Sequence, residues 1–250
     1  MGIGIPYSNQ YSVGLNPNIQ LNNYGRRVYF GPQGYGDSFQ NNSVTLLFDE
    51  NMIKGMIAQN PQIKNILAQN NIPLALNMKE LYELREKHCK QTMETAVEIA
   101  KNLPPALRQQ VNMANLKDAA ILHDFGKVLI PAQILNKPAS LTEQEAKIMN
   151  LHSELGFQLL QTILPNGEVL RLIRNHHNND NLDVNQQILN LADKYSALTE
   201  QRVYKPALTP KQALTVLFGE VKRGEVDKYV FNALVQSVKQ QESSQIVNKY

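Results

Sequence analysis

The chain has 250 residues, of which 42% are hydrophobic, and its formal net charge at pH 7 is +3. This length suits one medium domain with a sizeable core and appended segments. Lys and Arg are scattered among Asp and Glu, so no DNA or RNA polymer is expected as a partner. The single cysteine, Cys89, excludes an internal disulfide framework and favours a reducing, cytoplasmic compartment.

No apolar run approaches the roughly 18 residues of a transmembrane helix, so no membrane segment is expected. The first residues also lack the basic and apolar regions of a secretory signal. Residues 1–42 are rich in Gly, Asn, Gln, Tyr and Ser and show no helical period. We predict a disordered, low-complexity tail there, because such a segment buries too little apolar surface to offset its ordering entropy. A protein partner could dock on this tail.

From 43 to 77, short apolar bursts broken by Asn and Pro predict one or two short helices that form an N-terminal extension. Residues 78–103 predict a strong amphipathic helix, which Pro104 and Pro105 end. Its apolar stripe also carries a histidine and two threonines. The stripe consists of Leu81, Leu84, His88, Thr92, Thr95 and Ile99.

The next predicted helix ends near His123, with Gly126 as its C-cap. Thr142 and Glu145 have the spacing of a capping box, which predicts the start of another helix carrying His152 on its apolar face. No alternating segment stands out, so we predict an all-α fold, a helical bundle with an irregular N-terminal segment. The main domain is predicted over 78–242, with a C-terminal tail over 243–250. Further helices are predicted near 167–177, 184–200, 210–223 and 226–240.

Two of the five histidines, His176 and His177, are adjacent at the end of an apolar helical run. Neighbouring side chains on a regular helix diverge by about 100°, so the two would not chelate one ion tightly. Histidines at a helix C-terminus also favour the helix dipole, and capping explains this pair as well as metal binding does. The same divergence predicts that Cys89, beside His88, points away from the ligand face and is structural.

His88, His123 and His152 lie on the apolar stripes of different helices. Any one alone is better explained as a satisfied core histidine, but three aimed at one core favour metal ligation by neutral imidazole. Asp124 follows His123, and Asp193 lies in an apolar run, where a buried carboxylate needs a cation or strong hydrogen bonds. A mixed set of imidazoles and carboxylates suits Zn, Mn, Fe, Co or Ni.

The order of these residues resembles that of HD-domain phosphohydrolases, specifically the HD-GYP subgroup. The HD pair is followed by GK, then ILNKP, LT..E, M..H, HH and finally AD..SALT..R.Y. The similarity covers roughly residues 78–223. It implies a bacterial, metal-binding helical domain that hydrolyses phosphoesters, in this subgroup usually the cyclic dinucleotide c-di-GMP.

The resemblance also implies a role for each residue. Two divalent transition-metal ions are expected, Fe or Mn first and Zn, Co or Ni next, with Asp124 as the bridge between them. Such a pair would lower the pKa of a shared water, and Lys127 would stabilise charge on the phosphoryl oxygens. Asp124 and Lys127 are thus the expected catalytic residues, and Lys127, Arg202 and Lys205 the expected ligands of substrate phosphates. The implied metal ligands are His88, His123, Asp124, His152, His176, His177 and Asp193.

The chain departs from the subgroup at three places. Asn178 replaces a glutamate after the HH pair, and the GYP loop is absent, which leaves the choice between c-di-GMP and another nucleotide phosphoester open. Leu84 replaces a glutamate that supports a third metal in some members, with Glu83 and Glu86 off the ligand face, so no third ion is expected. Gln91 replaces the usual arginine after the first histidine.

Two alternatives stay open at this point. A catalytically degenerate regulatory module that binds a nucleotide or a partner protein would explain the missing loop and the Asn/Gln-rich tail. A di-iron oxygenase would use a similar ligand set, but Arg202 and Lys205 favour phosphate chemistry over oxidation.

Overall fold

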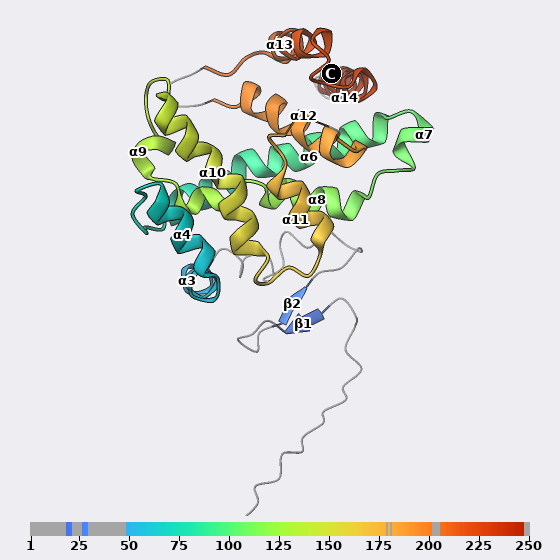
Figure 1. The fold of residues 1–250 in the computed structure, drawn as a ribbon. Coiled ribbons are helices and arrows are strands. Elements are labelled where there is room, and N and C mark those ends of the chain that lie inside the picture. The colour runs from blue at the N-terminus through green and yellow to red at the C-terminus, as the bar shows by residue number, and fades with distance from the viewer. Residues whose placement is uncertain are drawn as a thin grey trace, which may run out of the picture. The chain divides into compact units, whose positions relative to one another are not determined.

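The computed structural model describes residues 19–21, 27–29, 49–178, 180, 182–201 and 206–247. The chain divides into two compact units, Met1–Leu47 and Phe48–Tyr250. All regular elements among the described residues of the second unit are helices (Figure 1), which confirms the predicted all-α fold. Its elements in chain order are α3 (Glu50–Gln59), α4 (Pro61–Gln69), α5 (Met78–Leu84), η1 (Arg85–Cys89), α6 (Lys90–Asn102), α7 (Pro105–Arg108), α8 (Met113–Leu122), η2 (Phe125–Leu129), α9 (Ala132–Leu135), α10 (Glu143–Leu160), α11 (Gly167–Arg174), α12 (Val184–Thr199), α13 (Pro210–Lys222) and α14 (Lys228–Val247).

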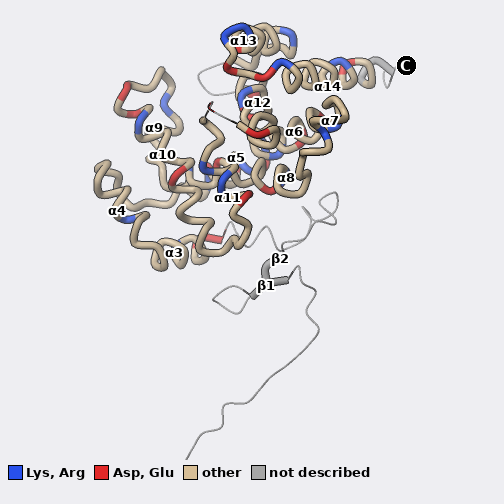
Figure 2. Tube along the Cα trace, turned by 45° about the vertical axis from the view of Figure 1, so that its right-hand side comes forward, with Lys and Arg blue, Asp and Glu red and all other residues tan. Residues whose placement is uncertain are grey.

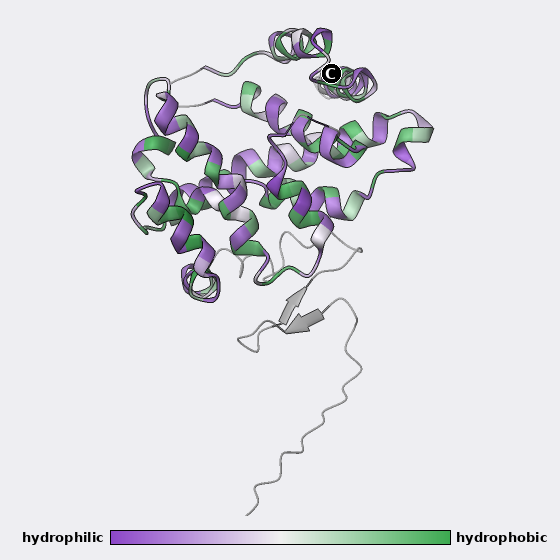
Figure 3. Cartoon of the chain, viewed as in Figure 1, coloured by the Kyte–Doolittle hydropathy of each residue, from purple (hydrophilic) through white to green (hydrophobic). Residues whose placement is uncertain are grey.

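Hydrophobic and hydrophilic residues alternate along the helices of the second unit (Figure 3), as expected for helices that each give one face to a core. Within the described ranges, no helix is both long enough and apolar enough to cross a membrane. Basic and acidic residues are interspersed over the same helices (Figure 2), in keeping with the scattered charge of the sequence.

The first unit contains a strand pair that the sequence pattern did not predict. Strands β1 (Ile19–Leu21) and β2 (Arg27–Tyr29) pair antiparallel, with Gln20 opposite Val28. Three residues per strand are too few for an alternating pattern to stand out. The rest of the predicted tail over 1–42 lies outside the described residues, so its disorder stays a prediction.

Helices α3 and α4 are the short helices expected between 43 and 77. The Asp49 carboxylate caps α3 by accepting a hydrogen bond from the Met52 N–H at 3.0 Å. Asn60 caps α4, and Pro61 occupies its first turn, where the missing N–H costs no hydrogen bond. Both helices pack against α10.

The predicted helix over 78–103 is continuous but not uniform. A π-helical turn, η1, separates α5 from α6 and contains His88 and Cys89. A π-turn holds an extra residue, so it changes the direction of the side chains on either side of it. The helix stops at Asn102 with Leu103 as its C-cap, as Pro104 predicts.

Gly126 does not cap a helix. It lies in η2, which packs directly against α10, and its φ is outside the left-handed region. A Cβ at Gly126 would fall 2.0 Å from the carbonyl oxygen of His152 and 2.4 Å from the backbone nitrogen of Gly156. The C-cap prediction was therefore wrong: glycine is needed because two backbones approach closely.

Helix α10 begins where the capping box predicts. The Thr142 hydroxyl accepts a hydrogen bond from the Glu145 N–H at 3.3 Å, and the Glu145 carboxylate accepts one from the Thr142 N–H at 2.7 Å. Lys137 pairs with the same carboxylate. These contacts define the start of the helix that carries His152.

Helix α6 packs against α8, α12 and α14, and α10 packs against η2 and α11. Buried aliphatic side chains such as Ile99, Leu116 and Leu155 fill the space between these elements. The packing brings together η1, the end of α8, the middle of α10, the turn after α11 and the middle of α12. Each of these five segments carries one or more of the predicted ligands.

Candidate metal centre

All five histidines of the chain meet in one cluster. His88 comes from η1, His123 follows α8, His152 lies on α10, and His176 and His177 follow α11. The first four are at most 2% exposed. Ring centroids of the contacting pairs lie 4.0–5.4 Å apart, so the rings share one small volume.

Three imidazoles form one half of the cluster. His152 Nε2 lies 3.0 Å from both His176 Nε2 and His177 Nε2. His152 Nδ1 and His176 Nδ1 each lie 2.6 Å from a backbone carbonyl, of Met149 and Ile173 respectively, and donate to it. A neutral ring that donates from Nδ1 has only a lone pair at Nε2, so the Nε2 atoms of His152 and His176 cannot hydrogen-bond to each other. They converge instead on a point that suits a cation.

Burial favours the neutral form of these rings, most strongly for His152 and His176, which are almost fully buried. Burial, reinforced by the nearby Lys127, lowers the pKa of His152 to about 3. Burial also lowers the pKa of His176 well below its ordinary value, and lowers that of His177. Neutral imidazole is the form that binds a metal ion.

His176 and His177 converge because the helix ends before them. Helix α11 stops at Arg174, and Asn175 leaves the helical conformation with φ −106° and ψ 12°. The 100° divergence of helical neighbours no longer applies there. The prediction that the pair diverges was therefore wrong, and the error came from extending the helix to 177.

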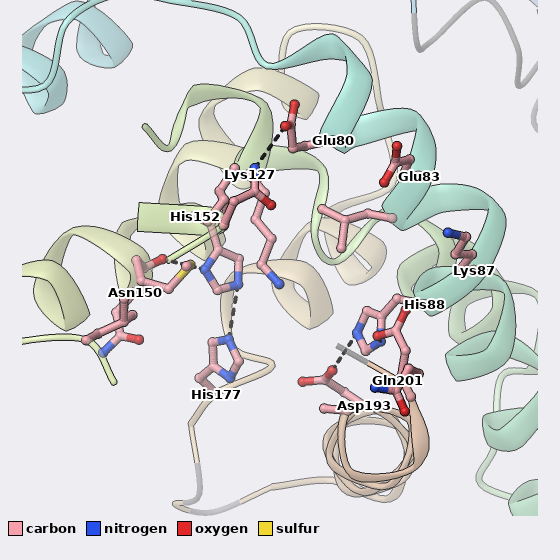
Figure 4. A pocket seen from close by; sticks show the side chains of 17 residues that line it. Glu80, Glu83, Lys87, His88, Lys127, Asn150, His152, His177, Asp193 and Gln201 are labelled. Atoms are coloured by element: carbon pink, nitrogen blue, oxygen red, sulfur yellow. Dashed lines mark hydrogen bonds and ion pairs between the residues drawn. The ribbon is translucent and has the colours of Figure 1, made fainter. Parts of the chain in front are cut away.

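The other half of the cluster contains carboxylates. Asp193 Oδ1 lies 3.0 Å from His88 Nε2 (Figure 4) and 3.6 Å from His123 Nε2. His123 donates from Nδ1 to the Ala120 carbonyl at 2.8 Å, while its buried Nε2 has no hydrogen-bond partner. A buried nitrogen left unpaired is costly, and a metal ion held by His88, His123 and Asp193 would satisfy it.

Asp124 faces both halves. Its Oδ1 lies 3.3 Å from His152 Nε2, and its Oδ2 lies 3.4 Å from His123 Nε2. Lys127 Nζ donates to Oδ2 at 2.6 Å. Burial opposes ionisation, but Lys127 and the nearby histidines hold the pKa of Asp124 well below its usual range. The carboxylate is therefore ionised and placed where one ion on each side could share it.

Residues 85–198 match a protein family described as the HD domain. This segment is an HD domain. The HD domain contains every ligand-type residue of the cluster, from His88 to Asp193, and the resemblance expected from the sequence is confirmed.

Relatives of this HD domain are named as phosphodiesterases. The chain is 26% identical over 180 residues to a 3'3'-cGAMP-specific phosphodiesterase of Vibrio cholerae, which covers 67% of this chain and 42% of that protein. It is 34% identical over 116 residues to a cyclic di-GMP phosphodiesterase response regulator of Xanthomonas campestris, covering 41% and 31%. A cyclic di-GMP phosphodiesterase of Thermotoga maritima is 31% identical over 112 residues, covering 38% and 30%. The chain spans less than half of the length of these relatives.

A pocket of about 470 Å³ opens onto the HD-domain cluster. In Figure 4, Lys127 reaches into the space between His152 and His177 on one side and His88 and Asp193 on the other. Further lining residues are Glu80, Glu83, Leu84, Lys87, Leu135, Asn136, Leu141, Met149, Asn150, Ala197, Glu200 and Gln201. Glu83 thus borders the pocket, although the regular helical period placed it off the ligand face.

Two predicted phosphate ligands, Arg202 and Lys205, lie outside the described residues, so their roles stay predictions. Asn178 and Gln91, which stand where the HD-GYP subgroup has a glutamate and an arginine, make other contacts. Asn178 O accepts a hydrogen bond from Asn190 Nδ2 at 2.6 Å, and Gln91 Nε2 donates to Thr199 Oγ1 at 3.0 Å.

Cys89 lies closer to the cluster than predicted. Its sulfur is within 4.8 Å of ligand-type atoms of His123 and Asp124, because η1 redirects the side chains around it. The prediction that it points away was wrong. Burial raises the pKa of the thiol well above its usual value, so the thiol is protonated.

The sequence pattern also missed Glu200. Its Oε2 lies 3.4 Å from His88 Nδ1. Burial lowers the pKa of His88, but contacts with Asp193 and Glu200 outweigh this and raise it to about 9. The available signal was the spacing of Asp193 and Glu200, because residues i and i+7 share a helix face.

Proposed function

We propose that the chain is a metal-dependent phosphodiesterase that hydrolyses a cyclic dinucleotide, c-di-GMP or 3'3'-cGAMP. The observation that carries this proposal is the position of the buried Asp124 between two ligand sets, with the Lys127 ammonium 2.6 Å away at the edge of an open pocket. The names of the relatives suggest the substrate class.

The proposed site holds two divalent ions, Fe or Mn first. His88, His123 and Asp193 would hold one, and His152, His176 and His177 the other, with Asp124 shared. The buried His123 Nε2, which has no hydrogen-bond partner, and the converging Nε2 atoms of the three imidazoles fit such ions. Bound there, the ions would supply a water of lowered pKa as the nucleophile.

Lys127 is proposed to stabilise the reacting phosphate. Its ammonium is held near Asp124 by the 2.6 Å contact and extends into the pocket (Figure 4). A fixed positive charge there would stabilise negative charge that develops on the phosphoryl oxygens. Arg202 and Lys205 are proposed to bind the phosphates, Arg202 with two parallel hydrogen bonds.

The test uses the purified full chain loaded with Mn²⁺ or Fe²⁺ and incubated with c-di-GMP, 3'3'-cGAMP and a panel of other nucleotide phosphoesters. We expect the ring of one cyclic dinucleotide to open to a linear product, and His123→Ala to abolish the reaction. Metal-loaded protein that leaves every substrate intact would contradict the proposal.

Asn178 and the missing loop favour a second candidate, a regulatory module that binds a cyclic dinucleotide without cleaving it. The complete ligand set around Asp124 weighs against this role, since binding alone does not require it. Equilibrium dialysis with each nucleotide separates the two: the module would retain bound, uncleaved nucleotide.

A further inference from the structure

Helix α12 approaches both ring nitrogens of His88. Asp193 Oδ1 lies 3.0 Å from Nε2, and Glu200 Oε2 lies 3.4 Å from Nδ1. The two carboxylates are seven positions apart, which is about two turns of an α-helix and places them on one face. Glu200 is the C-cap of α12, and its N–H donates to the Ser196 carbonyl at 2.9 Å, which fixes its backbone.

Glu200 occupies a position that backbone carbonyls fill elsewhere in the cluster. His123, His152 and His176 each donate from Nδ1 to the carbonyl three residues earlier. His88 lies in the π-turn and makes no hydrogen bond of normal geometry from Nδ1. Its contact with Glu200 at 3.4 Å is longer than the usual hydrogen bond of about 2.9–3.0 Å, so the carboxylate acts mainly through its charge.

We propose that Glu200 is a positioning residue that holds His88 with Nε2 toward the metal and strengthens its bond to the ion. This inference rests on the proposed metal site. A carboxylate at Nδ1 keeps the proton on that nitrogen, leaves the Nε2 lone pair for the ion, and makes the ring a stronger donor.

Glu200 also makes the two halves of the site electrostatically different. His88, in the set with His123 and Asp193, lies 3.4 Å from the Glu200 carboxylate and 3.0 Å from that of Asp193, whereas the other set consists of the imidazoles of His152, His176 and His177. The Glu200 side chain is 20% exposed, so part of its charge is shielded from water. Removing this charge should therefore weaken the ion at His88 and leave the ion at the three imidazoles in place.

The test measures Mn²⁺ binding by equilibrium dialysis and elemental analysis for the wild-type chain and for Glu200→Gln, Glu200→Ala and Glu200→Asp. We expect Glu200→Gln to weaken one of two bound ions roughly 10- to 100-fold, as is typical for partners of metal-ligating histidines. Glu200→Asp keeps the charge and should retain more affinity than Glu200→Gln. The far-UV circular dichroism spectrum measured in chelator should stay the same for Glu200→Gln, so that a folding defect is excluded.

The control is Glu154→Gln, which removes a carboxylate on α10 that pairs with Arg174 on α11 and accepts a hydrogen bond from Gln158. It should bind Mn²⁺ as the wild type does. Unchanged affinity in Glu200→Gln, or equal losses in the Gln, Ala and Asp variants, would overturn the positioning role. A wild-type chain that binds no Mn²⁺, Fe²⁺ or Zn²⁺ would instead contradict the proposed function.

Discussion

At the scale of single residues, protonation decides what the cluster can bind. Asp124 is ionised beside Lys127, and His152 and His176 are neutral because they are buried. His88 is the exception, since its carboxylate neighbours favour the imidazolium. A metal ion must displace that proton before it can use Nε2.

Lys127 gives the first prediction. Lys127→Ala should lower kcat by about 100-fold or more, because a preorganised charge near the reacting phosphoryl group typically contributes that much. Steady-state kinetics on the cleaved cyclic dinucleotide, with metal content measured in parallel, tests this. A variant with full metal content and wild-type kcat would show that Lys127 does not act on the reacting phosphate.

The raised pKa of His88 predicts a pH dependence of stability. When a chelator has removed the metal, the folded state binds the His88 proton more tightly than the unfolded chain does. His88 therefore contributes its full stabilisation below its ordinary pKa of 6.5. This contribution is lost as pH rises through about 9. Urea unfolding between pH 6 and 10 should show falling stability over this window, and His88→Gln should remove the slope. If the stability of His88→Gln still falls over this pH window, another titrating group causes the pH dependence.

At the scale of elements, the site depends on close packing of η2 against α10. Asp124 and Lys127 flank Gly126, and His152 lies on the facing helix, so one backbone contact sets the distance between the two sides of the site. The capping box at Thr142 and Glu145 fixes where α10 starts, and therefore which residues of α10 face η2.

Gly126→Ala tests this contact. The added methyl group would overlap backbone atoms at 2.0 and 2.4 Å, which cannot move as a side chain can. We expect a loss of stability of about 1–3 kcal/mol and lower metal affinity, because η2 must shift away from His152. Gly167→Ala is the matched control, since a Cβ there meets no atom within 4 Å, and it should be neutral or slightly stabilising. Equal effects of the two variants in denaturant titrations would contradict this role.

At the scale of the whole molecule, ligands from separate segments of the second unit meet at one point. Packing alone brings these ligands close together, and the unfolded chain lacks that packing, so ions bound there should stabilise the native state over the unfolded chain. The predicted domain boundaries at 77/78 and 242/243 stay predictions, whereas the division between Leu47 and Phe48 is a property of the fold.

Metal removal is the prediction at this scale. At a free metal concentration about 100 times the Kd, each ion should add roughly 2.7 kcal/mol to the free energy of unfolding. A chelator should therefore lower the unfolding temperature of the wild-type chain, and the same treatment should change His123→Ala much less. If neither chelator nor added Mn²⁺ changes the unfolding temperature of the wild-type chain, the native site binds no ion.

The sequence by itself determined the all-α class and most of the helices, because helical periodicity, proline stops and the Thr142–Glu145 capping box act over a few neighbouring residues. The seven ligand-type residues were assigned through the resemblance to HD-domain phosphohydrolases. Only the tertiary structure decided how those residues meet. The convergence of His176 and His177 depends on where α11 ends, the need for Gly126 depends on the backbone of α10, and the role proposed for Glu200 depends on a ring from η1. These contacts join segments far apart in the chain, and a local pattern holds no information about such distances.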